Sequence, residues 1–479
     1  MNTPAPTSST PATAGRFGLA RSLGHGQMAM IAMGSALGTG LFLGSGEAIG
    51  IAGPAVIVSF AIGSLIAATI ALAMGEMASR HPVRGGFGTL AAHYLSPFWG
   101  YLSRWLYWIV TVCVTGAEVV ACAAYLGYWV PGVPLWAGIL LFAAVIIGIN
   151  LSSVGSFGIV EFVLSSVKVI AVVVFILVGA LLVLTGLPGT PAAGFTHLTA
   201  DGGFAPMGWS AVWVALSVVM FSFGGIELLS ITAAEAKDPA RSIRTAARTT
   251  VVRLAIFYVA CITIVLCLVP WRTAATTGED LATSPFVMVF DQLGVPGAAH
   301  LTNAVVLIAA LSAANANLYA GSRIMHSLAS DGLAPQPMAL TTLRGVPLVG
   351  IAISSLGLLL AATLAFSGVG GVFGYMMSLV VFSVLTVWAL ILITFIAYRR
   401  RGTEGATFRM PGGVITAGVG LLGLAAILGT IFVRPSMMIA AAVGIPAIAV
   451  ATLLYVLVVR HRIDPADIEA AFAEADGMR

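Results

Sequence analysis

Charged side chains are the scarcest feature of this 479-residue sequence. They make up 8% of the chain, against 59% for hydrophobic residues, whereas a soluble domain carries about 25% charged residues. The mean hydropathy is +1.04. These values indicate a polytopic membrane protein with little length left for a soluble domain. The net charge of +4 lies in loops beside the predicted spans, so we expect a lipid bilayer and no nucleic acid as partner.

Enzyme and metal-site motifs are also missing. The sequence contains no G-x-x-x-x-G-K-[ST], no H-E-x-x-H and no G-x-S-x-G, which excludes a phosphate-binding loop for ATP-driven transport and the commonest hydrolase signatures. The four cysteines lie in apolar runs without C-x-x-C spacing, so we expect buried free thiols and neither a disulfide nor a metal site. The protein is therefore expected to be no enzyme and to need no cofactor.

Twelve apolar runs are long enough to cross a bilayer, since a helical span needs about 20 mainly apolar residues. They cover residues 27–49, 54–78, 101–127, 134–153, 158–186, 209–233, 251–271, 300–323, 347–367, 370–397, 413–433 and 436–459. Of the 22 Lys and Arg residues, 19 lie on one side of these spans, two on the other and one inside a span. Because cytoplasmic loops carry the basic excess, both termini are predicted to be cytoplasmic, with tails at 1–26 and 460–479.

Two of the spans contain glycines that a plain spanning helix would not need. Gly34, Gly38 and Gly40 interrupt the first span, and Gly224-Gly225 interrupts the sixth. Unwound backbone at membrane depth survives only where it is buried in protein or lines a cavity. Free N–H groups at a break suit a carboxylate and free carbonyls suit an ammonium, so the two breaks predict an amino acid site. The alternative for the first span is that its glycines are small-residue contacts between helices.

The breaks lie five spans apart, which indicates two five-helix repeats followed by an additional pair. An odd number of spans in each repeat makes the repeats inverted. We therefore predict an all-α transporter domain at 27–459, with a first repeat at 27–186, a second at 209–397 and an appended helix pair at 413–459.

Six ionisable side chains lie within spans, where each costs about 3 kcal/mol or more and usually faces the bundle interior. Glu118, Lys168 and Glu227 lie deepest and are predicted to be functional. Lys168 is the only lysine near mid-membrane, so we predict that it couples transport to protons; the alternative is a structural ion pair with Glu118 or Glu227. The remaining three are expected to snorkel or to cap helix ends: Glu47, Glu76 and Glu161.

Two connecting segments carry further patterns. Residues 235–244 contain Asp-Pro followed by basic residues at helical spacing, which predicts a helix on the membrane surface, although orientation alone also explains the charge. The outward segment 281–293 has Pro285 near its start and Pro296 just after its end. We expect a short external helix or lid there.

Several short motifs occur in a fixed order along nearly the whole chain: Gly34-Ser35-Ala36-Leu37-Gly38-Thr39-Gly40-Leu41-Phe42, Ala52-Gly53-Pro54, Gly75-Glu76-Met77, Phe221-Ser222-Phe223-Gly224-Gly225-Ile226-Glu227, Glu235-Ala236-Lys237-Asp238-Pro239, Pro270-Trp271, Ser284-Pro285-Phe286 and Ser322-Arg323. In this order they resemble the amino acid, polyamine and organocation transporter superfamily, specifically its amino acid transporter family of bacterial and fungal permeases. The sequence is most similar to the branch for proline, histidine, aromatic amino acids and γ-aminobutyrate.

The resemblance implies that the substrate is held between the first and sixth helices. The backbone amides of the first break would receive its carboxylate, and backbone carbonyls of the second would receive its amine. Lys168 would replace the sodium ion of sodium-coupled relatives, and Glu118 and Glu227 match acidic positions assigned to proton coupling. The implied substrate-binding residues are Leu37, Gly38, Thr39, Gly40, Phe221 and Gly224. Further candidates for the coupling site lie on the eighth helix: Ser312, Asn315 and Asn317.

Together these features predict a secondary permease of the inner membrane that imports a neutral amino acid with a proton by alternating access. No acidic or basic cluster is available for a charged substrate side chain. The closest alternative is an amino acid exchanger. A sensor that binds without transport would need a signalling domain, and an intramembrane enzyme would need a catalytic pair within the spans. The sequence does not determine the oligomeric state.

Overall fold

The computed structural model describes Gly26, Met30 and residues 37–186, 191–232, 239–275, 284–292, 297–368, 371–402, 408–463, 469–470 and 472–473. Residues 34–36 of the first glycine motif, Lys237 and most of both predicted tails lie outside these ranges. Within them, every regular element is a helix, which confirms the all-α class.

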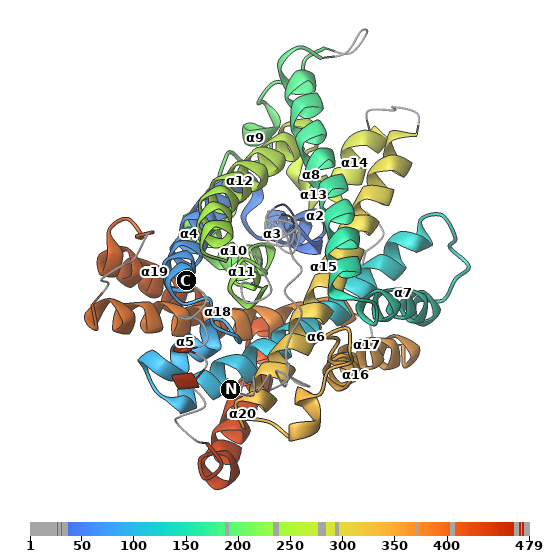
Figure 1. The fold of residues 1–479 in the computed structure, drawn as a ribbon. Coiled ribbons are helices and arrows are strands. Elements are labelled where there is room, and N and C mark those ends of the chain that lie inside the picture. The colour runs from blue at the N-terminus through green and yellow to red at the C-terminus, as the bar shows by residue number, and fades with distance from the viewer. Residues whose placement is uncertain are drawn as a thin grey trace, which may run out of the picture.

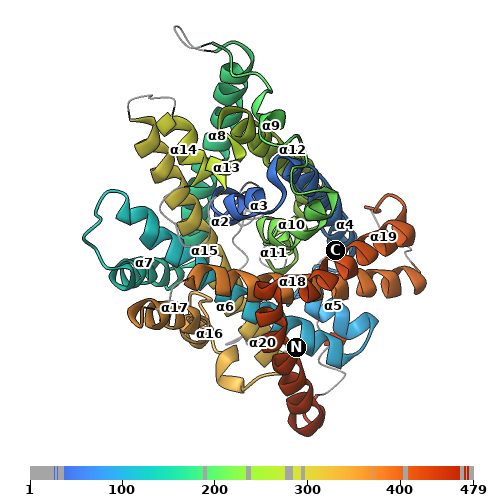
Figure 2. The same cartoon turned by 180° about the vertical axis from the view of Figure 1, so that it is seen from behind.

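The main helices follow the predicted apolar runs closely (Figures 1 and 2). Their bounds are α2 (Thr39–Phe42), α3 (Gly44–Ala52), α4 (Val56–Arg80), α5 (Phe87–Tyr94), α6 (Pro97–Gly127), α7 (Leu135–Asn150), α8 (Val154–Leu184), α9 (His197–Ala200), α10 (Trp209–Ser222), α11 (Leu228–Thr232), α12 (Pro239–Leu268), α13 (Trp271–Ala274), α14 (Pro285–Gln292), α15 (Ala298–Ser330), α16 (Leu348–Ser354), α17 (Leu356–Phe366), α18 (Val372–Arg400), α19 (Gly413–Leu428) and α20 (Pro435–Leu454). Three 3₁₀-helices and one π-helix complete the set: η1 (Gly53–Ala55), η3 (Gln336–Ala339), η4 (Gly429–Phe432) and η5 (Tyr455–Val459).

Seven helices in the described ranges are long and apolar enough to cross a membrane, and four shorter apolar helices accompany them. The long helices α6, α15 and α18 are mostly buried, and α6 packs against both α15 and α18. By contrast, α8 and α20 present many exposed apolar side chains, such as Ile170, Leu177 and Ile445. Exposed apolar surface of this extent fits contact with lipid. The protein is thus an all-helical, multi-pass membrane protein.

The predicted break of the sixth span is present at the centre of the molecule (Figure 1), where α10 ends at Ser222 before α11 begins at Leu228. In the first span Leu37 and Gly38 are not helical, but Gly40 lies inside the single turn of α2, and the turn that separates α2 from α3 is at Leu43, three residues beyond the predicted glycines. We call residues 37–43 the first break. The chain between α10 and α11 passes through Gly225 at φ 101°, a conformation that glycine adopts without steric cost. Helices α2 and α3 both pack against α10, so the two breaks lie side by side.

The predictions for the two connecting segments, 235–244 and 281–293, had different outcomes. Residues 235–238 lie outside the described ranges, and for 239–244 the prediction of a separate surface helix is wrong, because these residues begin α12, which continues without interruption to Leu268. Proline suits the first turn of a helix, where its missing N–H has no partner to lose, so the basic residues extend the seventh span. The predicted short helix between the prolines is confirmed as α14, which packs against α12 and α15. All four cysteines are buried and free, as expected.

Candidate functional site

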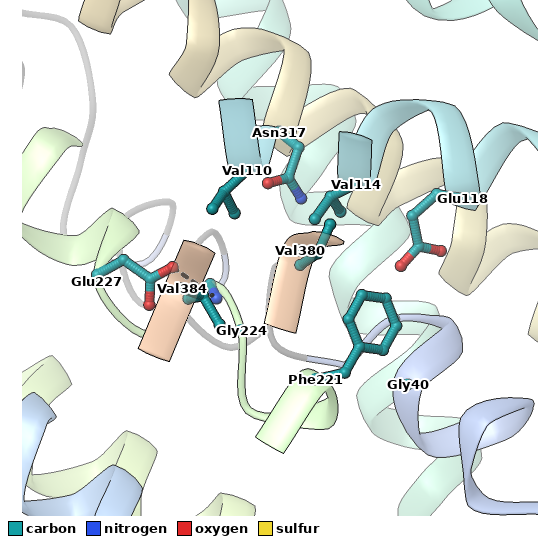
Figure 3. Close-up of a pocket in the computed structure, with 12 residues that line it drawn as sticks. Gly40, Val110, Val114, Glu118, Phe221, Gly224, Glu227, Asn317, Val380 and Val384 are labelled. Atoms are coloured by element: carbon teal, nitrogen blue, oxygen red, sulfur yellow. Dashed lines mark hydrogen bonds between the residues drawn. The ribbon is translucent and has the colours of Figure 1, made fainter. Parts of the chain in front are cut away.

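A small cavity lies where the two breaks meet (Figure 3). It measures about 20 Å³, which is room for about one water molecule. An amino acid therefore fits only if the walls of the cavity separate. The lining residues come from α2, α6, α10, α15, α18 and the segment after α10: Gly38, Gly40, Val110, Val114, Glu118, Phe221, Gly224, Gly225, Glu227, Asn317, Val380 and Val384.

The first break reaches the cavity through its glycines. Gly38 and Gly40 line it, whereas Leu37 is buried in the surrounding hydrophobic core. A Cβ atom added at Gly40 would lie 2.6 Å from the Cα of Ser222. Glycine at position 40 therefore allows the backbones of α2 and α10 to touch.

The backbone of Thr39 binds a carboxylate of the protein itself. The Thr39 N–H donates to both carboxylate oxygens of Glu118, at 3.2 and 3.3 Å. The carboxylate of Glu118 is 3% exposed and lies at the end of the cavity beside Gly40 (Figure 3). A backbone amide of the first break thus binds a carboxylate, and in this structure the carboxylate belongs to the protein.

The second break is held by its own polar contacts. Phe221 and Gly224 line the cavity, and the carbonyl of Phe221 accepts a hydrogen bond from the N–H of Gly224 at 3.1 Å. The carboxylate of Glu227 accepts from the N–H of Gly225 at 3.1 Å and from the indole N–H of Trp388 at 3.0 Å. Glu227 therefore secures the unwound segment, and Trp388, which the sequence did not single out, links it to α18.

Valine side chains form the walls between the two carboxylates. Figure 3 shows Glu118 and Glu227 on opposite sides of Val110, Val114, Val380 and Val384. These walls, together with the ring of Phe221, are apolar. The one amide at the cavity is Asn317, whose Nδ2 donates to the carbonyl of Ala313 at 2.9 Å.

Lys168 lies outside the cavity lining and is fully buried in α8. It lies within electrostatic range of two carboxylates, Glu118 on α6 and Glu161 on its own helix. Glu227, the other carboxylate considered as an ion-pair partner of Lys168, contacts a different set of groups. Glu118 links Lys168 to the backbone of the first break.

Glu161 is the main correction to the sequence-based assignments. It was expected to snorkel or cap a helix end, but its side chain is 0% exposed. It accepts hydrogen bonds from Ser165 at 3.0 Å, from Asn315 Nδ2 at 3.0 Å and from the hydroxyl of Ser312. Its position near one end of the span hid this role, because two of the three donors, Ser312 and Asn315, come from α15 where it packs against α8.

The eighth-helix candidates consequently divide between two sites. Ser312 and Asn315 face Glu161, whereas Asn317 lines the cavity. Asn315 Oδ1 also accepts from Asn150 Nδ2 on α7, at 2.9 Å.

The other two acidic residues near span ends form ion pairs; snorkelling is wrong for the fully buried Glu76, whereas Glu47 is 30% exposed in the first turn of α3. Glu76 is buried and contacts Arg399 Nη2 at 2.6 Å, and it also accepts from the N–H of Met410 at 2.6 Å. Glu47 pairs with Arg434 at 2.6 Å. Among the residues with described positions, no three His, Cys, Asp or Glu side chains cluster as metal ligands would.

Comparison with known proteins gives a match to a family model described as amino acid permease, over residues 27–464. The chain is 40% identical to the aromatic amino acid transport protein AroP of Escherichia coli O6:H1 over 424 residues, which cover 88% of this chain and 92% of that protein. The AroP protein of Shigella flexneri is 39% identical with the same coverage. The uncharacterized amino acid permease YtnA of Bacillus subtilis is 35% identical over 431 residues, 89% of this chain and 92% of that protein.

Proposed function

Because this chain belongs to the amino acid permease family, we propose that it imports a neutral amino acid with an aromatic side chain across the inner membrane, together with a proton. Family membership makes the chain an amino acid transporter and not an enzyme, in agreement with the resemblance seen in the sequence. The observation that supports an aromatic substrate is the valine-lined cavity between the two breaks. The name of the AroP relatives points to the same substrate class.

In this proposal the substrate carboxylate takes the place of the Glu118 carboxylate at the first break. The N–H of Thr39 already binds a carboxylate there, and the adjacent Gly40 leaves the turn open. The ammonium group lies near the carbonyls of Phe221 and Gly224. The side chain then occupies the space between the valines, because an apolar ring gains free energy by leaving water for an apolar site.

We also propose the finer architecture that the breaks imply, namely twelve spans in two inverted five-helix repeats with an added pair and cytoplasmic termini. The glycine-rich breaks lie five predicted spans apart and adjoin in space. Substrate sites at the interface of inverted repeats, built from discontinuous helices, are typical of secondary transporters. Rocking of one bundle against the other would open the cavity to each side in turn.

Lys168 is the proposed proton-coupling group. Its burial separates it from water, and the Glu118 carboxylate connects it to the first break. Entry of a substrate carboxylate at Thr39 would release Glu118 to pair more closely with Lys168. Substrate binding and the protonation state of this pair would thereby influence each other.

Transport by purified protein in proteoliposomes tests the proposal. A panel of phenylalanine, tyrosine, tryptophan, histidine, proline, γ-aminobutyrate, glutamate and lysine should show uptake driven by an inward pH gradient, strongest for the aromatic amino acids. Lys168→Met should retain substrate counterflow at equal pH but lose accumulation driven by the gradient, and Lys168→Arg should block cycling because arginine stays charged. Undiminished gradient-driven uptake by Lys168→Met would refute proton coupling through this residue. Counterflow without any gradient-driven uptake by the unmodified protein would favour the exchanger.

A further inference from the structure

A second buried polar cluster lies outside the lining of the cavity between the breaks. It is centred on the Glu161 carboxylate, which accepts from Ser165, Ser312 and Asn315. Asn150 extends the cluster to α7 through its bond to Asn315. Burying a carboxylate in a membrane protein is costly and usually marks an ion or proton path.

The cluster lies directly in line with Lys168. Residues 161 and 168 are seven positions apart on α8, which is about two helical turns, so their side chains project from one face. Ser165 lies between them, one turn from Glu161, and donates to it. The electrostatic interaction of Lys168 with both Glu161 and Glu118 completes a row of ionisable groups from the first helix break to Glu161.

Glu161 is also the member of this row nearest the predicted cytoplasmic end of α8. One turn further in that direction, the ring of Phe157 stacks on Tyr319 at 3.7 Å with an interplanar angle of 9°. The guanidinium of Arg323 lies over the ring of Tyr319, with its Cζ 3.4 Å from the ring centroid. The stacked pair therefore separates Glu161 from the predicted cytoplasmic side in this structure.

We propose that Glu161 is a second proton-carrying residue, which receives the proton from Lys168 and releases it to the cytoplasm. This inference rests on the proposed coupling through Lys168. The Lys168 ammonium gives one proton to the Glu161 carboxylate, leaving a neutral amine and a neutral carboxylic acid. When the Phe157–Tyr319 stack opens, the acid gives the proton to water and returns to carboxylate.

The partners of Glu161 suit both of its protonation states. The hydroxyls of Ser165 and Ser312 can donate to a carboxylate, and each can rotate to accept from a carboxylic acid. Among the residues with described positions, the charged groups around Glu161 are Lys168 on its own helix, Glu118 beyond Lys168 and Arg323 on α15, whereas Asn150 and Asn315 do not titrate. A proton moving from Lys168 to Glu161 removes two opposite charges together, so the buried cluster gains no net charge.

Three variants in proteoliposomes test this role. Glu161→Gln keeps one oxygen to accept from the Ser165 and Ser312 hydroxyls, replaces the oxygen that accepts from Asn315 by an amide NH2, and carries no exchangeable acidic proton. We expect it to fold, to elute as a single species and to retain substrate counterflow at equal pH. Its gradient-driven uptake, and the substrate-induced acidification of an internal pyranine probe, should fall at least about tenfold, in keeping with the usual contribution of a proton-transfer group. Glu161→Asp should restore part of the proton flux because it restores a carboxylate.

The matched control is Ser166→Ala, on the same helix, where the hydroxyl is exposed and bonds only to the carbonyl of Phe162; it should behave as the unmodified protein. Full proton flux in Glu161→Gln, with loss in Lys168→Met, would overturn the role of Glu161 and leave the proposed function intact. Loss of counterflow together with proton flux in Glu161→Gln would assign Glu161 a purely structural role and also overturn the inference. Full proton flux in Lys168→Met would refute the proposed coupling itself.

Discussion

The closest contact between the two breaks gives the sharpest prediction about the substrate site. Gly40→Ala adds a single Cβ atom, which would lie 2.6 Å from the Cα of Ser222 and 3.0 Å from its N and from Cδ1 of Phe221. Two of these three atoms are backbone, so rotation of a side chain cannot relieve the contact. The backbones of α2 and α10 must separate instead.

The size of the effect follows from that distance. Ordinary contact for a Cβ atom begins near 3.4 Å, so the separation required is about 0.8 Å. Overpacking of this kind costs about 1–3 kcal/mol, which corresponds to roughly 5- to 150-fold in an equilibrium constant. We expect substrate affinity to decrease by a factor within this range, because binding needs both breaks in their native positions. Gly40→Val should decrease the affinity further.

Gly44→Ala is the matched control, one turn further along the same broken span. Its added Cβ would lie 3.8 Å from Sδ of Met377 and 3.9 Å from the carbonyl oxygen of Thr39, which are ordinary contacts. The assay is equilibrium binding of labelled phenylalanine to purified protein, after size-exclusion chromatography has established equal folding. Normal affinity in Gly40→Ala, or equal losses in both variants, would refute the placement of the substrate at the meeting point of the breaks.

Three further outcomes are expected. Reporter fusions after Arg401 should read cytoplasmic and a fusion after Gly278 external; the opposite result for either would break the inverted-repeat proposal. Glu76→Ala should lower the free energy of unfolding by about 3 kcal/mol, because it leaves the guanidinium of Arg399 without its buried partner, and thermal unfolding in detergent measures this; no change would show that the pair contributes nothing. Burial, assisted by Arg401, lowers the pKa of His93, so the unfolded state binds more protons at this site. Stability should therefore fall as pH drops through the ordinary histidine pKa near 6.5, and His93→Gln should weaken that dependence of the melting temperature.

The sequence by itself determined the class of protein and the positions of most helices. Long apolar runs have one stable solution in a bilayer, since a helix satisfies its backbone hydrogen bonds internally, and this local rule requires no knowledge of neighbours. The same reasoning located the break at Gly224-Gly225, whereas in the first span the turn falls at Leu43, beyond Gly40. It also failed at 239–244, where local polarity suggested a separate element although these residues begin α12.

Only the tertiary structure decided what the buried carboxylates contact. Glu161, Glu76 and Glu47 looked alike in the sequence as acidic residues near span ends, yet one is held by serine and asparagine side chains from α8 and α15 and the other two by arginines. Their partners lie up to several hundred residues away in the chain, as Arg399 and Arg434 do. Hydropathy reports how far a side chain lies from water, but not which donors reach it. Which donors reach a carboxylate depends on how the helices pack. Here the packing places the Glu118 carboxylate at the N–H of Thr39 and surrounds Glu161, two turns from Lys168 on α8, with donors from α15.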